Sequence, residues 1–185
     1  LHSWQCHVET GEHPDQLVFD LDPDDSVPWK IVKEAAFEIR DLLKGLNLKS
    51  FVKTTGGKGL HIHVPIAPIY RWDQTKNFSM AVMQQLESEQ PGRYTTKISK
   101  KARKGKIFLD YLRNGFGSLA IAPYSLRNRE IASVAMPVTW TELKTLQGAQ
   151  FFTLSKTLSR IKSQKRDPWA GYFKLQQKIS ILRAE

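Results

Sequence analysis

The sequence of 185 residues contains little cysteine, no long hydrophobic run and comparatively few acidic residues. Its single cysteine, Cys6, excludes an internal disulfide and is typical of a protein in a reducing compartment. No apolar run approaches the roughly 18 residues that a membrane-spanning helix needs, so we expect no membrane partner. The first residues also lack the basic start and apolar stretch of a signal peptide.

The shortage of acidic residues makes the chain strongly basic. Its 28 lysines and arginines outnumber 18 aspartates and glutamates, which leaves a formal net charge of +10. This surplus favours a polyanionic partner, most simply nucleic acid, although an anionic membrane surface or no specific partner would also be compatible with it. The hydrophobic fraction of 41% and the chain length suit one globular domain with a real core.

Hydrophobic periodicity predicts strands and helices that do not alternate strictly. Ser26 is expected to cap a helix over 27–45, and Asp73 a helix that runs to about residue 89. Thr139 and Glu142 have the spacing of a capping box before a short helix. Further helices are predicted over 151–162 and 168–182, and strands over 16–22, 48–55, 60–66, 105–112 and 118–126. This order favours an α+β fold over a doubly wound parallel sheet.

The stretch LVFDLDPDD, residues 17–25, ends a predicted strand in a run of carboxylates. Asp20 and Asp22 are two residues apart on that strand, so their side chains point to the same face. Neighbouring carboxylates disfavour each other's ionisation, and a divalent cation between them removes this cost. Two such carboxylates therefore predict a hard-oxygen site for Mg²⁺ or Mn²⁺, with a solvated strand end as the alternative. Asp24 and Asp25 fit a solvated turn before the helix.

The stretch KTTGGKGLHIH, residues 53–63, combines three glycines with a lysine and two histidines. The glycines let the backbone approach a ligand, and backbone N–H groups with Lys58 can bind phosphate oxygens. The loop is not a Walker A motif, because Gly59 stands where Ser or Thr must follow the lysine. His61 and His63 share a strand face, and we expect one of them to contact phosphate rather than zinc. A glycine-rich hairpin turn is the alternative.

The stretch KKARKGKIFLDYLRN, residues 100–114, places a cationic segment directly before a strand that carries Asp110. Three strand-borne carboxylates with a basic, glycine-rich loop are what a two-metal nucleotidyl transferase needs. Arg127 and Arg129 supply further cations in APYSLRNR. The cations expected on a DNA-facing surface are Lys100, Lys101, Arg103, Lys104 and Lys106. A solvated loop and an acid at a sheet edge are the alternatives.

Another alternative is a metal-dependent phosphatase of the haloacid dehalogenase type. Such enzymes also begin with a strand and Asp-x-Asp. In this sequence Asp24 replaces the usual Thr or Val two residues on, and no later Gly-Asp-x-x-x-Asp is present.

Taken together, these motifs resemble the polymerase domain of bacterial ligase D, in the end-joining branch of the archaeo-eukaryotic primase superfamily. The matching stretches occur in the family's order over nearly the whole chain, and they are LHSW, LVFDLDP, KTTGGKGLHIHVP, KGKIFLDYLRNG, IAPYSLR and DPW. The resemblance implies a primase-like palm with a mixed, RNA-recognition-motif-like sheet flanked by helices. It also implies a bacterial cytoplasmic enzyme that adds nucleotides, with ribonucleotides preferred, to a DNA 3′-hydroxyl in end-joining repair.

The resemblance assigns roles to individual residues. Asp20, Asp22 and Asp110 match the catalytic acids that hold Mn²⁺ or Mg²⁺ in a two-metal site. His61 matches the histidine that contacts the incoming triphosphate, and Thr55 stands where the family usually has Ser. The full set expected to bind nucleotide is His2, Thr55, Gly57, Lys58, His61 and Arg127.

The resemblance also implies what surrounds this catalytic domain. The family has a sizeable segment before the position of Leu1, which helps to cover the sheet and contributes to binding DNA and its 5′-phosphate. We therefore expect residues 1–185 to be a single catalytic domain that is N-terminally incomplete relative to the family. Expected partners are DNA ends with a 3′-hydroxyl, nucleoside triphosphates, attached ligase or nuclease domains and a Ku-type end-binding protein. A DNA- or nucleotide-binding module with an incomplete site is the alternative to an active polymerase.

Overall fold

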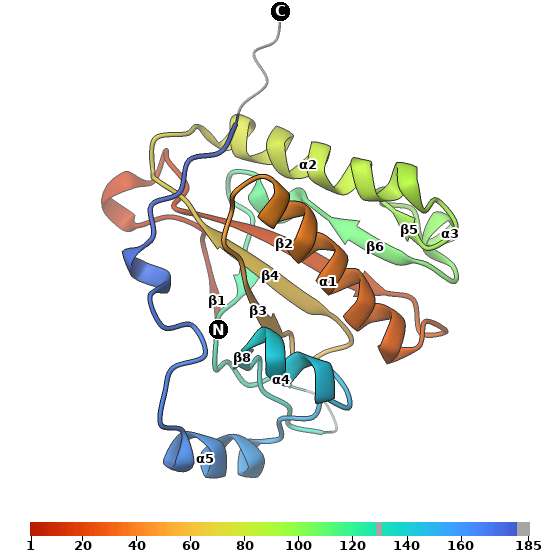
Figure 1. Ribbon diagram of the computed structural model, residues 1–185, viewed down its shortest axis with the longest axis vertical. Coiled ribbons are helices and arrows are strands. Elements are labelled where there is room, and N and C mark those ends of the chain that lie inside the picture. Colours follow the sequence, from red (N-terminus) through yellow and green to blue (C-terminus); the bar gives the residue numbers. More distant parts are fainter. Residues whose placement is uncertain (129–130, 181–185) are drawn as a thin grey trace, which may run out of the picture.

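The computed structural model describes residues 1–128 and 131–180 (Figure 1). Its centre is a six-stranded sheet with the strand order β5-β6-β2-β4-β3-β8. The neighbours β5 and β6 are parallel, and the other neighbouring strands are antiparallel. The strands are β2 (Gln16–Pro23), β3 (Phe51–Thr54), β4 (Leu60–Pro65), β5 (Tyr94–Thr95), β6 (Ile107–Asp110) and β8 (Pro137–Val138). This mixed sheet with flanking helices confirms the predicted α+β class.

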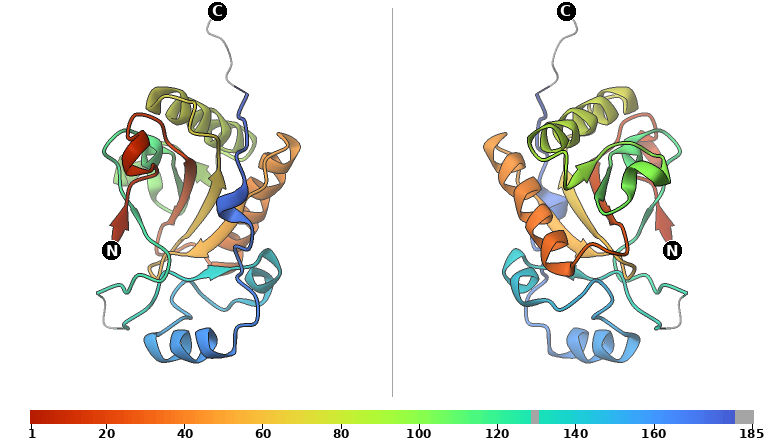
Figure 2. Two further views of the ribbon diagram at one scale, coloured as in Figure 1. Left: turned by 90° about the vertical axis from the view of Figure 1, so that its left-hand side faces the viewer. Right: turned by 90° about the vertical axis from the view of Figure 1, so that its right-hand side faces the viewer.

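Two long helices cover one face of this sheet, α1 (Trp29–Gly45) and α2 (Trp72–Glu89) (Figure 1). Alternate residues of the central strands point toward them and form the main core, among them Phe19 on β2 and Ile62 on β4. The opposite face therefore receives the intervening residues of each strand. Figure 2 shows a second, two-stranded sheet on that side, in which β1 (His2–Ser3) pairs with β7 (Ala120–Ile121).

The remaining helices are short. They are α3 (Lys100–Arg103), α4 (Trp140–Thr145), α5 (Leu154–Ser163) and the 3-10 turns η1 (Val8–Thr10), η2 (Leu112–Asn114) and η3 (Tyr172–Lys174). The predicted capping box is present before α4, because Thr139 Oγ1 accepts from the N–H of Glu142 and the Glu142 carboxylate accepts from the N–H of Thr139. No helix in the described ranges has both the length and the apolar character to cross a bilayer.

Two predicted helix caps are wrong. The helix predicted from residue 27 begins at Trp29, after Pro28, and Ser26 instead donates its hydroxyl to Asp24 Oδ1 at 2.6 Å. The next helix is capped at Arg71 rather than Asp73, and the Gln74 side chain accepts from the N–H of Arg71. In both turns several residues could cap the helix, and the hydrogen bonds formed locally determine which residue does so.

The prediction of a helix over 168–182 is wrong within 168–180, and residues 181–182 lie outside the described ranges. Only η3 is helical there, because Trp169 and Tyr172 pack against Phe51 on β3. The Gln177 side chain donates to the backbone carbonyl groups of Lys49 and Pro65, which holds the segment extended along the sheet. The strand predicted over 118–126 is likewise reduced to the two residues of β7.

Candidate active site

A row of ionisable residues crosses the sheet face opposite α1 and α2. Asp110 on β6 lies opposite Asp20 on β2, and Asp20 lies opposite His61 on β4. His61 in turn lies opposite Lys53 on β3. Directly opposed residues share a sheet face, so four strands contribute to one row. All four side chains belong to buried residues, and none of these residues is more than 8% exposed.

A cavity of about 310 Å³ opens beside this row. Arg113 and residues 119–121 form part of its wall. The predicted site residues that line it are His2, Asp20, Asp22, Thr55, Lys58, His61 and Arg127. These residues are far apart in the sequence, so it is the tertiary structure that brings most of the predicted nucleotide and metal residues to one cavity.

Arg113 connects Asp20 and Asp110, the two acids of the row. Its Nε lies 3.2 Å from Asp20 Oδ2 and 3.3 Å from Asp110 Oδ2. On the other side of Asp20, His61 Nε2 lies 3.3 Å from Oδ1. Asp110 Oδ1 accepts a hydrogen bond of 2.8 Å from the backbone N–H of Leu112. The acids are thus held in defined positions by neighbours on both sides.

These neighbours give the three acids different pKa values. Burial raises the pKa of Asp20, but the adjacent His61 ring and the Arg113 guanidinium outweigh it and lower the pKa to about 2. Burial and the nearby Asp20 carboxylate together raise the pKa of Asp110. The same two causes raise the pKa of Asp22. One acid is therefore firmly ionised, and the other two are more easily ionised when another cation is close.

The three carboxylates are chemically suitable ligands for a divalent cation. Three carboxylates offer the hard oxygen ligands that Mg²⁺ and Mn²⁺ prefer. Within residues 1–128 and 131–180, no group of three or more His, Cys, Asp or Glu side chains is already gathered as a metal site. The acids are engaged with arginines instead: Asp20 and Asp110 with Arg113, and Asp22 with Arg103. A divalent cation at these acids would take over the role of these arginines.

The cationic segment before β6 divides into two groups. Lys100, Lys101 and Lys104 are exposed. Arg103 lies with its guanidinium 3.5 Å from the centre of the Phe108 ring and its Nη1 3.5 Å from Asp22 Oδ2. Lys106 Nζ donates to the Pro91 carbonyl oxygen at 2.6 Å. Of the five predicted DNA-binding cations, three are therefore exposed at the surface, and the other two have contacts within the chain.

The glycine-rich loop is organised by its own hydrogen bonds. Thr55 Oγ1 donates to the Gly59 carbonyl oxygen and accepts from the N–H of Gly57, each at 3.1 Å. Gly57 lies outside the cavity lining, whereas Thr55 and Lys58 belong to it. The Lys58 ammonium group pairs with the carboxylate of Asp25, which is not part of the cavity lining. Thr55 and Lys58 thus border the cavity, and the Thr55 hydroxyl, the Lys58 ammonium group and the Gly57 N–H each already have a partner within the chain.

The two histidines of the loop motif have different surroundings. His63 is buried under Trp169, with ring centroids 4.9 Å apart, and its Nδ1 lies 2.9 Å from Gln16 Oε1. His61 alone lines the cavity. Of the two, His61 is therefore the candidate for a phosphate contact, and His63 belongs to the packing beneath the carboxyl-terminal segment.

Sequence reasoning missed two members of the site. Arg113 follows Asp110 by three residues within the quoted DYLRN, but nothing local shows that it turns back to both acids. Lys53 opens the quoted KTTGGKG, yet its complete burial was not expected. That burial lowers the pKa of Lys53 to about 7, against the raising influence of Asp20, and its Nζ has no hydrogen-bond partner within the described ranges. The predicted Arg129 lies outside the described residues.

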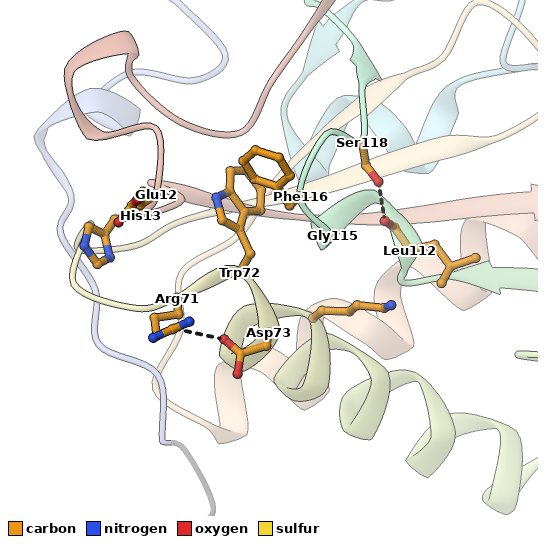
Figure 3. A pocket seen from close by; sticks show the side chains of 10 residues that line it. Glu12, His13, Arg71, Trp72, Asp73, Leu112, Gly115, Phe116 and Ser118 are labelled. Carbon is orange, nitrogen blue, oxygen red and sulfur yellow. Dashed lines mark hydrogen bonds and ion pairs between the residues drawn. The ribbon is translucent and has the colours of Figure 1, made fainter.

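A second hollow of about 850 Å³ is lined in part by the segment that follows β6, including Leu112, Gly115 and Phe116 (Figure 3). Trp72 and Phe116 meet there with ring centroids 6.0 Å apart, and Ser118 Oγ donates to the Leu112 carbonyl oxygen. Its lining, in the part of the chain that the structure describes, includes none of the predicted site residues. The segment 112–119 therefore contributes residues to both hollows, with Arg113 and Leu119 in the lining of the candidate active site.

Comparison with known proteins supports one family. The family described as "LigD, primase-polymerase domain" matches residues 1–169. The multifunctional non-homologous end joining protein LigD of Pseudomonas aeruginosa is 42% identical over 181 residues, which cover 97% of this chain and 22% of that protein. The bifunctional non-homologous end joining protein LigD of Bacillus subtilis is 32% identical over 155 residues, covering 83% of this chain and 25% of that protein.

A solved structure agrees with these relatives. The polymerase domain from Mycobacterium tuberculosis ligase D, in complex with DNA, superimposes with a TM-score of 0.76 at 36% identity. The superposition covers 82% of this chain and 53% of that one, and this chain spans about a quarter or less of the two LigD proteins above. Sequence motifs, fold and relatives agree, and the chain belongs to the LigD primase-polymerase domain family.

Proposed function

We propose that this chain carries the nucleotidyl-transfer site of a DNA end-joining polymerase, which adds nucleotides to a DNA 3′-hydroxyl. Family membership supports the proposal at the level of the domain. The observation that carries it is the cavity in which the carboxylates of Asp20 and Asp22 lie with Thr55, Lys58 and Arg127. Acids on one side and phosphate-binding groups on the other are what transfer of a nucleotide from its triphosphate requires.

In this proposal the three aspartates would hold Mn²⁺ or Mg²⁺, which would supply Lewis-acid stabilisation of the phosphoryl oxygens and the attacking hydroxyl. Asp20 is the anchor, because its low pKa keeps it ionised. Lys58 and Arg127 bind the triphosphate, and the Thr55 hydroxyl joins them by giving up its hydrogen bond to the Gly59 carbonyl oxygen. His61, whose Nε2 lies 3.3 Å from Asp20 Oδ1, contributes a contact beside that acid. His2 on β1 borders the same cavity and completes the nucleotide site.

The DNA would lie across the basic side of the site. Lys100, Lys101 and Lys104 are exposed beside the strand that carries Asp110, and exposed cations bind phosphates by releasing counterions. The related polymerase domain of Mycobacterium tuberculosis is bound to DNA in its solved structure. A preference for ribonucleotides, and a place beside ligase or nuclease domains and a Ku-type protein, belong to the same proposal.

Primer extension with Mn²⁺ tests the activity. We expect the wild type to extend a DNA primer, and Asp110→Asn to abolish extension while the circular dichroism spectrum stays unchanged. Asp24→Asn removes a half-buried acid at the turn, which accepts from Ser26 and lies outside the cavity lining, and is the matched control. Full activity of the Asp110→Asn variant would contradict the assignment of the acids.

Triphosphate titration separates an active polymerase from a binding module. A charged hydrogen bond to phosphate is worth roughly 1.5–3 kcal/mol, so His61→Ala should weaken binding by about ten- to a hundredfold. Triphosphate binding without extension would favour a binding module with an incomplete site. Unchanged binding by His61→Ala would remove this residue from the nucleotide site.

A further inference from the structure

The guanidinium of Arg113 occupies the position between two acids that oppose each other across β2 and β6. Asp20 and Asp110 are direct partners in the register of this strand pair, so their carboxylates stand side by side on one face. Arg113 Nε reaches an oxygen of each, at 3.2 and 3.3 Å. A single cationic group thus lies between two acids and offsets their mutual repulsion, which would otherwise disfavour the folded arrangement.

Arg113 can leave this position without disturbing the core. Its side chain is 41% exposed, whereas those of Asp20 and Asp110 are only 10% and 11% exposed. The acids are held by strand pairing on both sides of β2. Arg113 belongs to η2, a single 3-10 turn, and lines the open cavity. The anions are therefore fixed in the sheet, and their cation is attached to a short turn with solvent in reach.

We propose that Arg113 is an exchangeable internal counter-ion, which Asp20 and Asp110 share in the metal-free protein and which leaves them when a divalent cation binds. This inference rests on the proposed function, which places that cation at the same acids. Arg113 is a positioning residue in this scheme: it keeps the pair of acids assembled and competes with the ion for them.

The exchange is coupled to the wall of the cavity. Arg113 Nη1 also donates to the Leu119 carbonyl oxygen at 3.2 Å. Leu119 lines the active-site cavity, whereas Gly115 and Phe116 line the neighbouring hollow (Figure 3). Release of Arg113 from the acids removes or redirects its hydrogen bond to the Leu119 carbonyl oxygen, which holds the segment 115–119. Binding of the cation thereby changes the segment 112–119, whose residues line both the active-site cavity and the neighbouring hollow.

Mn²⁺ affinity provides the first test, with free Mn²⁺ measured by electron paramagnetic resonance. Arg113→Gln removes the competing cation, so we expect Mn²⁺ to bind about tenfold more tightly, which equals about 1.4 kcal/mol. Arg160→Gln removes the same charge from an ion pair with Glu142 and is the matched control, with unchanged affinity expected. Equal or weaker Mn²⁺ binding by Arg113→Gln, relative to the wild type, would overturn the proposal.

An Asp110→Asn variant in the same titration separates this inference from the proposed function. If Asp110→Asn leaves Mn²⁺ binding unchanged, the ion does not use these acids and the metal site of the proposed function fails. If Asp110→Asn abolishes binding while Arg113→Gln has the affinity of the wild type, only the exchange of Arg113 fails.

The exchange can also be observed in the unaltered chain. In isotope-labelled wild-type protein, the Arg113 Nε–H signal should be protected from solvent exchange and should lose that protection as Mg²⁺ is added. The Arg160 signal should not respond. Arg113→Lys retains a cation and should bind Mn²⁺ more weakly than Arg113→Gln, which shows that charge rather than lost packing is responsible. An Arg113 Nε–H signal that stays protected in saturating Mg²⁺ would overturn the proposal even if Arg113→Gln does not fold.

Discussion

Replacement of Gly59 by alanine tests how closely the glycine-rich loop approaches the strand that carries the acids. A Cβ atom added at Gly59 would lie 1.8 Å from the carbonyl oxygen of Leu21 and 3.3 Å from Pro23 Cδ. The first atom is backbone of β2, between Asp20 and Asp22, and it cannot rotate away as a side chain could. The two strands must therefore separate by well over an ångström to accept a methyl group.

This separation should cost stability and disturb the site together. Overpacking of a well-packed region costs about 1–3 kcal/mol, and the backbone location puts Gly59→Ala at or above the upper end. For a domain of this size each kcal/mol lowers Tm by about 2–4 °C. The Mn²⁺ affinity should fall as well, because the displaced Leu21 lies between two of the acids.

Urea unfolding with linear extrapolation measures the loss. Gly148→Ala is the matched control, because its added Cβ would meet no atom within 4 Å. We expect that control to stay within about 0.5 kcal/mol of the wild type. If Gly59→Ala unfolds with the same free energy as Gly148→Ala, the close approach of the loop to β2 is wrong.

Two further predictions concern lysines. Lys100 and Lys101 are exposed on α3, so replacing both with alanine should flatten the dependence of log DNA affinity on log salt by roughly one unit per lost phosphate contact. The control pair is Lys30 and Lys44 on α1, the helix that covers the opposite sheet face. Equal slopes for the two double variants would exclude α3 from the DNA interface. Burial lowers the pKa of Lys53 to about 7, so between pH 7 and 10 the unfolded chain binds more protons at this residue than the folded chain does. The free energy of unfolding should therefore rise with pH in this range, by at most about 1.4 kcal/mol per pH unit from this group. Lys53→Met should flatten that rise when urea unfolding is compared at pH 7 and 9, and an identical rise in both proteins would refute the buried, unpaired lysine.

The sequence alone determined the features that depend on neighbours along the chain. Strand alternation put Asp20 and Asp22 on one face, and both line the same cavity. Helical spacing of apolar residues located α1 to within a few residues. The capping box at Thr139 located α4, because its two hydrogen bonds join residues only three apart. Each of these signals depends only on residues a few positions apart in the chain.

Only the tertiary structure decided which distant groups meet. The register of β2 with β6 sets Asp20 opposite Asp110, and the turn after β6 brings Arg113 to both acids. Lys53 is completely buried on the same sheet face as His61, which its neighbours along the chain do not indicate. The apolar spacing of Trp169 and Tyr172 suits a helix, but packing on Phe51 stabilises an extended segment with one 3-10 turn instead. Contacts between residues far apart in the chain depend on strand register and loop path, and short-range periodicity carries no information about either.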